Sequence, residues 1–258
     1  MKKYFLVMGL LLGILINGCA SKEDTDTKSK KEIYYEEILA LEDKMESLEY
    51  FKMTKTEDKQ YAVCQGEAIK IKQSDPSPVN YSFHYEPNKE VRYIATKKVR
   101  DEIQTITQYY RNGKIYVSYS QMPYDLVVKE DSAKYAFFDI AIKGVDLKYY
   151  TITKAKKEDE IIYTITLKKA KQYNEKYPDD YDDKTCNIIG DYKAQRIILT
   201  VNKDGYLRKE EVDLTLDYGD QNENVLQAEA STRYEFYDYG VIDELDFRIV
   251  NAVYPEEE

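Results

Sequence analysis

The chain lacks tryptophan altogether and has only one histidine, three cysteines, six prolines and ten glycines among its 258 residues. The single histidine, His84, excludes a zinc site built from several histidines, and a serine or cysteine nucleophile would have to use this one ring. No partner for it is apparent nearby, so His84 is interpreted as an ordinary strand residue. The sequence also shows no glycine-rich phosphate loop, serine elbow or nucleotide fingerprint. No catalytic residue and no cofactor is therefore predicted, and an enzyme is the minority hypothesis.

Tyrosine and acidic residues are what the chain has in abundance. Its 27 tyrosines favour a β-rich fold, because the ring packs on a pleated surface while the hydroxyl stays in water. With no tryptophan present, sheet packing explains these rings better than an aromatic carbohydrate site does. The formal net charge of −10 repels phosphates, which argues against a nucleic-acid partner and against electrostatic contact with anionic lipids.

The most specific pattern in the sequence lies in its first nineteen residues. Lys2 and Lys3 precede an almost unbroken apolar run at residues 4–16, and Gly18 then precedes Cys19. This pattern resembles the signal peptide and lipobox of bacterial lipoproteins. The apolar run is short for a transmembrane helix and has flanks suited to cleavage. The alternative is an ordinary secretory signal followed by a chance cysteine.

The lipoprotein resemblance implies a location and an anchor. Residues 1–18 would be removed, and Cys19 would carry a diacylglycerol thioether and often a third acyl chain such as palmitate. At least two chains are needed for stable anchoring, because a single acyl chain binds membranes reversibly. The expected location is therefore extracytoplasmic, at the bacterial cell membrane, with the membrane contact made by the lipid.

Two cysteines remain once Cys19 is lipidated, namely Cys64 and Cys186. An extracytoplasmic setting permits a disulfide between them. Such a bridge would close a loop of roughly 120 residues and add about 4–5 kcal/mol on the chain-entropy model. Two separate thiols are the alternative, because a domain of this size needs no covalent staple.

The segment after Cys19 is predicted to be a tether followed by a helix. Residues 19–30 are almost entirely polar, which predicts a flexible connection to a single domain at residues 31–258. Residues 31–48 have apolar positions at spacings of three and four, which predicts an amphipathic helix. The apolar stripe is Tyr34, Ile38, Leu41, Met45 and Leu48, and the other faces carry Glu36, Glu37, Glu42, Asp43, Lys44 and Glu46. A coiled-coil seam is the alternative, but the pattern spans few turns.

Strand-like alternation dominates the chain after the helix, with turn residues between the strands. Alternation begins around residues 61–72. The clearest hairpin joins residues 103–110 to 115–120 through Asn112-Gly113, a pair that tolerates positive φ. Two more pairs are predicted: 147–155 with 161–167 across a turn at 156–160, and 194–201 with 206–218 across a turn at 202–205. Val212, Leu214, Leu216 and Tyr218 should share a buried face, with Asp213, Thr215 and Asp217 on the other.

Three further segments have weaker patterns. Residues 228–239 are expected to form the last strand, and residues 131–142 fit a second helix, although they also alternate as a strand would. The long insertion at 173–183 is the expected partner-contacting loop, with a solvated connection as the alternative. Its acidic run, Asp179-Asp180-Tyr181-Asp182-Asp183, lacks the spacing and the glycine of a calcium loop, so no metal site is predicted.

These elements together predict an α+β fold, in which a curved, half-barrel-like antiparallel sheet packs on the N-terminal helix. Over most of residues 31–254 the pattern resembles the LolA/LolB-like lipoprotein-carrier fold. The resemblance rests on residues 39–50, on Asn112-Gly113-Lys114-Ile115-Tyr116, on residues 163–167 and 201–207, and on Tyr237-Asp238-Tyr239-Gly240-Val241.

The LolA-like resemblance implies binding of a lipid or another hydrophobic ligand between helix and sheet, as a carrier or sensor at the cell envelope. No ligand-binding residue can be assigned from it. The same apolar faces would equally form a filled core. The rival hypothesis is a surface adhesion or scaffolding lipoprotein that binds a protein or glycan partner through its outer tyrosines and the acidic insertion.

Overall fold

The computed structural model describes residues 28–48, 50–65, 68–74, 76, 78–86, 90–99, 102–111, 114–119, 122–130, 141, 145–177, 189–219 and 225–241. The predicted signal peptide at 1–18, Cys19 and most of the tether lie outside these residues. So do the second helix expected at 131–142, apart from Ala141, and the acidic run with Cys186. Within the described residues, no helix is both long and apolar enough to span a membrane.

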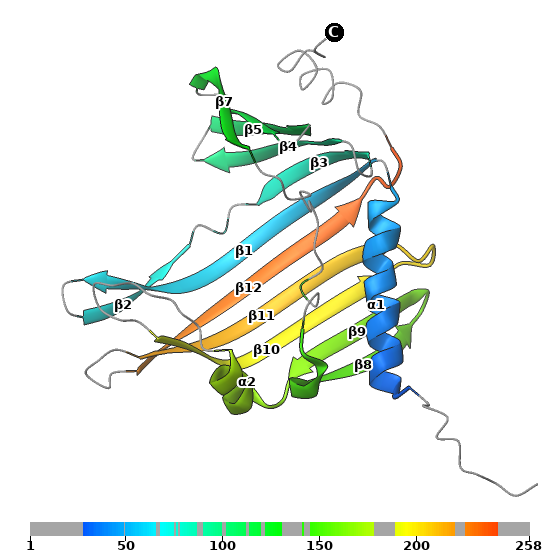
Figure 1. The fold of residues 1–258 in the computed structure, drawn as a ribbon, viewed down its shortest axis with the longest axis vertical. Coiled ribbons are helices and arrows are strands. Elements are labelled where there is room, and N and C mark those ends of the chain that lie inside the picture. The colour runs from blue at the N-terminus through cyan, green and yellow to red at the C-terminus, as the bar shows by residue number, and fades with distance from the viewer. Residues whose placement is uncertain are drawn as a thin grey trace, which may run out of the picture.

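One curved antiparallel sheet and a long helix dominate the described chain (Figure 1). The helices are α1 (Lys30–Glu46), α2 (Ala170–Lys176) and the 3-10 turn η1 (Leu147–Tyr149). The strands are β1 (Tyr50–Gln65), β2 (Ala68–Gln73), β3 (Val79–Glu86), β4 (Glu90–Val99), β5 (Glu102–Arg111), β6 (Lys114–Tyr119), β7 (Met122–Glu130), β8 (Tyr150–Lys157), β9 (Glu160–Leu167), β10 (Ile189–Val201), β11 (Leu207–Gly219) and β12 (Val225–Tyr237).

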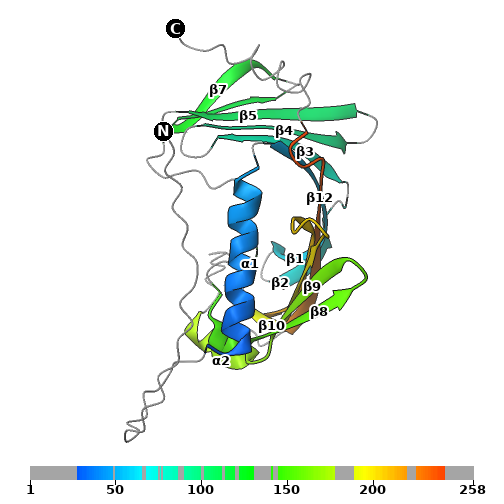
Figure 2. The ribbon, with the colours of Figure 1, turned by 90° about the vertical axis from the view of Figure 1, so that its right-hand side faces the viewer.

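The strand order is β7-β6-β5-β4-β3-β1-β12-β11-β10-β9-β8, with β2 paired only to β1. The first and last strands therefore meet in the middle of the sheet, where Lys52 pairs with Tyr237. Figure 2 shows the sheet bent into an arc with α1 on its concave side. This architecture confirms the predicted α+β class with a curved antiparallel sheet on the N-terminal helix.

The α1 helix is specified locally by its cap and its apolar stripe. Ser29 accepts a hydrogen bond from the backbone of Glu32, whose side chain accepts one from the backbone of Ser29, which completes a capping box. Residues 29 and 30 therefore belong to the helix start and not to the tether. Ile38 and Met45 are fully buried, and Tyr34, Leu41 and Leu48 pack against the core, which confirms the predicted stripe.

The main core lies between α1 and the concave face of β8, β9 and β10. Alternate residues in parts of these strands are buried, and the pairing of Ile152 with Ile165 and of Ile165 with Ile197 aligns the buried positions across the three strands. A smaller cluster lies where β1 leaves β12 and pairs with β2. It contains Ala62, Ile69, Tyr218 and Ala228.

The predicted hairpins are present, with two corrections at the β8–β9 pair. Lys157 pairs with Glu160, so the connection is the two-residue turn Glu158-Asp159 and not residues 156–160. Strand β8 also begins at residue 150 and not at residue 147, because residues 147–149 form η1. The β5–β6 hairpin pairs Arg111 with Lys114, as expected for a turn at Asn112-Gly113, although those two residues lie outside the described ones.

Local hydrogen bonds and a glycine explain why the β10–β11 turn could be predicted from the sequence. The side-chain oxygen of Asn202 accepts hydrogen bonds from the backbone N–H groups of Asp204 and Tyr206. Gly205 has φ +79°, a conformation that favours glycine. The turn is therefore encoded by local residues, as the 202–205 pattern predicted.

Candidate functional site

The concave face of the sheet is the candidate ligand site, and α1 covers it unevenly. Inward residues of β9 and β10, such as Ile165, Ile197 and Leu199, are fully buried beneath the helix. In the middle of β11 the inward side chains of Val212, Leu214 and Leu216 are only half-buried, whereas those nearer its ends are buried. The structure therefore has a closed core on one side of α1 and partly accessible apolar surface on the other.

Two carboxylates are buried at the border between these regions. Glu42 on α1 is 4% exposed and Glu210 on β11 is 1% exposed. The backbone N–H of Ala141 donates to Oε1 of Glu210 over 2.7 Å. Burial raises the pKa of Glu210 to about 7, a rise opposed by the Ala141 hydrogen bond and supported by the charge of Glu42.

The burial of Glu42 corrects its expected position on a polar helix face. It lies one turn after Ile38 and so points toward the sheet. Glu210 was not recognised from the sequence either, although it has the inward parity of Val212 and Leu214. That alternation was the available signal, and a charged residue at an inward position marks a polar part of the concave face.

Tyr234, opposite Glu210 on β12, extends this polar part toward β1. Burial, together with the charges of Glu210 and Glu57, raises the pKa of Tyr234 to about 12. Lys55 lies 5.9 Å from the centre of the Tyr234 ring and forms an ion pair of 3.2 Å with Glu57. The concave face of β11, β12 and β1 is thus amphipathic, with apolar side chains beside carboxylates, a phenol and an ammonium group.

A second polar cluster fastens α1 to the sheet. Glu37 accepts hydrogen bonds from Lys154 Nζ (2.8 Å) and from Tyr163 Oη (2.9 Å). Although partial burial opposes it, these bonds hold the pKa of Glu37 below its usual value. The same Lys154 also lies over the rings of Tyr34 and Tyr163. These partners satisfy one another, so this cluster is interpreted as a structural joint and not as a ligand site.

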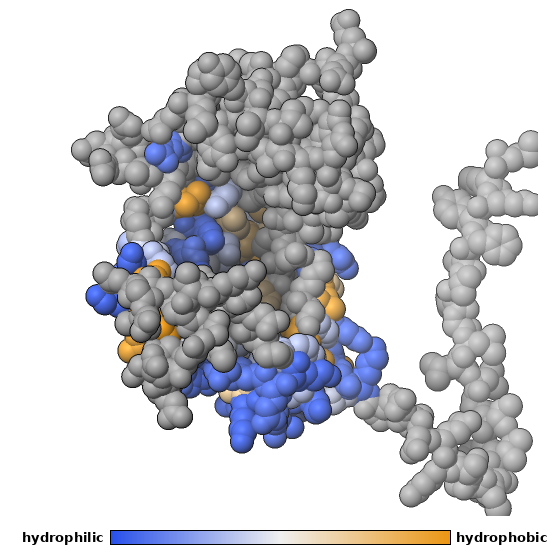
Figure 3. Space-filling view, turned by 60° about the vertical axis from the view of Figure 1, so that its left-hand side comes forward, coloured by the Kyte–Doolittle hydropathy of each residue, from blue (hydrophilic) through white to orange (hydrophobic). Residues whose placement is uncertain are grey.

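The space-filling view shows hydrophilic and hydrophobic residues next to one another in a recess of the molecule (Figure 3). An amphipathic recess suits a ligand with an apolar body and a polar group. Among the described residues, no group of three or more histidine, cysteine, aspartate or glutamate side chains could hold a metal ion.

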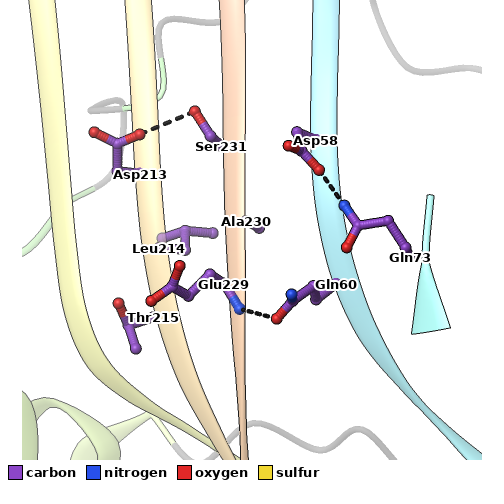
Figure 4. A pocket seen from close by; sticks show the side chains of 9 residues that line it. All are labelled: Asp58, Gln60, Gln73, Asp213, Leu214, Thr215, Glu229, Ala230 and Ser231. Atoms are coloured by element: carbon purple, nitrogen blue, oxygen red, sulfur yellow. Dashed lines mark hydrogen bonds between the residues drawn. The ribbon is translucent and has the colours of Figure 1, made fainter. Parts of the chain in front are cut away.

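A polar groove of about 380 Å³ lies on the opposite, convex face (Figure 4). It lies where β1 diverges from β12, and its outward side chains come from β1, β2, β11 and β12. Asp58 accepts a hydrogen bond from the side chain of Gln73, and Asp213 accepts one from Ser231 (2.9 Å). Gln60 accepts one from the backbone N–H of Glu229 (3.1 Å). Asp58, Asp213 and Glu229 give the groove three carboxylates, so its charge suits a cationic or hydroxyl-bearing partner.

The structure describes the backbone of two of the residues singled out in the sequence, His84 and Cys64, whereas Cys19 and Cys186 lie outside the described residues. His84 lies on β3, paired with Tyr50, and Cys64 lies on β1, paired with Ile69. The side chains of both lie outside the described ones, so the disulfide stays a prediction. Tyr173, expected in a partner-contacting loop, instead lies in α2 and packs against Tyr149, Tyr150 and Tyr192.

The comparisons with known proteins assign no family. No protein-family model matches the chain, and no curated protein is similar to it. Among solved structures, the chain is similar to the LolA superfamily protein NE2245 from Nitrosomonas europaea, with 11% sequence identity and a TM-score of 0.26. That match covers 80% of this chain and 93% of the other. A likeness at this level carries no argument for family or function, and the fold class stated above rests on the sheet and helices of this chain alone.

Proposed function

We propose that this protein is a cell-envelope lipoprotein, anchored through Cys19, that binds a lipid or another hydrophobic molecule between sheet and helix. The observation that supports the proposal best is the uneven cover over the concave face. Val212 and Leu214 stay half-buried next to the buried Glu210, whereas equivalent residues under α1 are sealed. An acyl chain or similar apolar body would cover the accessible side chains, which is the main source of affinity for such ligands.

The polar group of the ligand would lie near Tyr234 and Lys55. These side chains offer a hydroxyl and an ammonium donor at the edge of the apolar surface. Binding of this kind needs no catalysis, so the proposed role is that of a carrier or sensor. Its place outside the cytoplasmic membrane follows from the proposed lipid anchor.

The absence of tryptophan makes the site testable with a single introduced fluorophore. Val212→Trp places an indole on the concave face, and Asp213→Trp, one residue further along β11, places it on the convex face. A brominated fatty acid quenches tryptophan only at close contact. We expect saturable quenching in the Val212→Trp chain and none in the Asp213→Trp chain.

Native mass spectrometry of the purified protein, before and after solvent extraction, gives an independent measurement. A lipid-sized mass that is lost on extraction supports the proposal. Equal quenching at both positions, or no quenching together with a chain that carries no extractable lipid, would contradict it.

The convex groove supports the second candidate function, binding of a protein or glycan partner. Its carboxylates and amides would recognise a cationic or hydroxyl-rich surface. Asp58→Asn with Asp213→Asn should abolish capture of such a partner and leave quenching at Val212→Trp unchanged. Deleting residues 173–183 is a poor test of this function, because Tyr173 belongs to the packed tyrosine cluster.

A further inference from the structure

A basic patch lies at the end of the molecule where α1 begins. Six lysines with exposed side chains form it, from the first turn of α1, from η1 and from α2 with the two residues before it: Lys30, Lys148, Lys168, Lys169, Lys171 and Lys176. None of these six forms an ion pair with a described residue. Lys148 and Lys176 lie over the rings of Tyr149 and Tyr177, and within the described residues no acid neutralises any of the six.

Specific contacts bring the three segments together. Lys31 Nζ of α1 donates to the carbonyl of Leu147 in η1 over 2.9 Å, and the backbone N–H of Lys168 donates to the carbonyl of Tyr149 over 2.8 Å. The Tyr149 ring packs edge-on against Tyr173 of α2 at 5.7 Å between centroids. Figures 1 and 2 agree that the start of α1 and α2 lie at the same end of the molecule.

The acids of these segments are fewer, and all but the exposed Glu175 of α2 are engaged. Glu32 is held by the capping box of α1, and Glu36 pairs with Lys28. Asp146 accepts hydrogen bonds from the backbone of Lys148 and from Tyr177. This end of the described chain is therefore locally cationic, although the whole chain carries a net charge of −10.

Exposed apolar side chains accompany the lysines. Ile33 is 42% exposed on the first turns of α1, and Tyr177 is 43% exposed directly after α2. A membrane interface favours lysines that reach headgroup phosphates together with a tyrosine or aliphatic side chain at headgroup depth. The patch thus combines the two contacts that peripheral membrane surfaces use.

We propose that this patch docks on the anionic lipid headgroups of the membrane and fixes the orientation of the domain. Lysines near an anionic surface each contribute an attraction that salt screens. The tether that precedes Lys30 would start at the membrane, so it enters the domain on the docking side. Such docking would be a local exception to the expectation that the acidic domain avoids anionic lipids, because the charge is unevenly distributed.

Hydrogen exchange of the full chain with vesicles tests this docking. The full chain is used because the acidic residues 179–183, which follow α2 in sequence, lie outside the described residues. Vesicles of phosphatidylcholine are compared with vesicles that also contain phosphatidylglycerol. We expect slowed exchange of α2 and of the first turn of α1 only with phosphatidylglycerol, and loss of this protection in 0.5 M NaCl, roughly where the Debye length falls to a few ångströms.

Two charge-matched triple variants complete the test. Lys30→Glu with Lys168→Glu and Lys171→Glu should abolish the protection. Residues 30 and 171 lie in the first turns of α1 and α2, where an acidic side chain does not weaken a helix, and Lys168 lies on exposed chain before α2. Lys70→Glu with Lys72→Glu and Lys203→Glu changes the net charge equally on exposed residues outside the patch and should retain it. Equal loss in both variants, or protection by soluble polyglutamate without protection by vesicles, would overturn the proposal.

Discussion

Glu210 is the single residue that distinguishes the concave face most clearly from an apolar core. A carboxylate in this position loses its hydration, and one backbone N–H replaces only part of it. Glu42 and Tyr234 are the described titratable groups that face it, and neither supplies a positive charge. The folded state therefore holds a proton on Glu210 up to near neutral pH.

The proton held on Glu210 makes the free energy of unfolding depend on pH. The folded pKa of about 7 lies above the ordinary value of 4.5, so the folded state binds a proton that the unfolded chain releases between these pH values. The free energy of unfolding should fall as pH rises through this window, by about 3 kcal/mol in total, and the contribution should level off above pH 7.

Glu210→Gln should remove that dependence, because the amide oxygen keeps the Ala141 hydrogen bond without ionising. The variant should match the wild type near pH 4 and exceed it in stability at pH 8, as measured by urea unfolding. Glu235→Gln, which removes an exposed carboxylate from the convex face of the neighbouring strand β12, is the matched control and should retain the pH dependence of the wild type. A wild-type profile that is flat from pH 5 to pH 7 would refute the assignment.

Among the helices and strands, α2 is held to β10 by a side chain that forms the pair of backbone hydrogen bonds a neighbouring strand would form. Asn174 donates from Nδ2 to the carbonyl of Tyr192 over 3.0 Å, and its Oδ1 accepts from the backbone N–H of Tyr192 over 3.1 Å. The pairing of β10 with β11 is shifted just after Tyr192. Asn174 thus joins a short helix to an irregular part of the sheet edge.

Asn174→Ala should cost about 1–3 kcal/mol of unfolding free energy, because both backbone groups of Tyr192 lose these partners. Hydrogen exchange should increase mainly in α2. Gln172→Ala, on the exposed side of the same helix, should change stability by less than about 0.5 kcal/mol. An equal effect of both substitutions would mean that the Asn174 bonds do not hold the helix.

Helices and turns that are specified by their own residues could be predicted from the sequence. Elements that depend on contacts with residues distant in the sequence could not. The 202–205 turn is fixed by Asn202 and Gly205 themselves, and the stripe of α1 by its own periodicity. By contrast, α2 has no side-chain cap and depends on rings from η1, β8 and β10. Glu42 was assigned to the wrong face because its charge was taken to mark a polar face, although it lies one turn after Ile38; only the tertiary structure places Glu210 near it. The candidate site was therefore anticipated as a space between helix and sheet, without its polar residues.

For the molecule as a whole, we expect a cavity in one apolar cluster to lower global stability and a cavity in the other to loosen only its own strands. Ile38→Ala opens the main cluster, where α1 meets the sheet, and should cost about 2–5 kcal/mol of global stability. Ile69→Ala opens the small cluster under β2. Exchange should then accelerate in β2 and leave α1 unaffected, because the cluster unfolds locally. Accelerated exchange of α1 in Ile69→Ala would show instead that the two clusters form one cooperative unit.

The meeting of β1 with β12 has a consequence for biogenesis. Lys52 cannot find its partner Tyr237 until nearly all of the described chain has been synthesised. Until then β1 can pair only with β2 and β3, and the half of the sheet that contains β8–β11 has no link to the half that contains β3–β7. Assembly of the whole sheet is therefore deferred until nearly all of the described chain has been synthesised, and the two halves of the sheet stay separate until then.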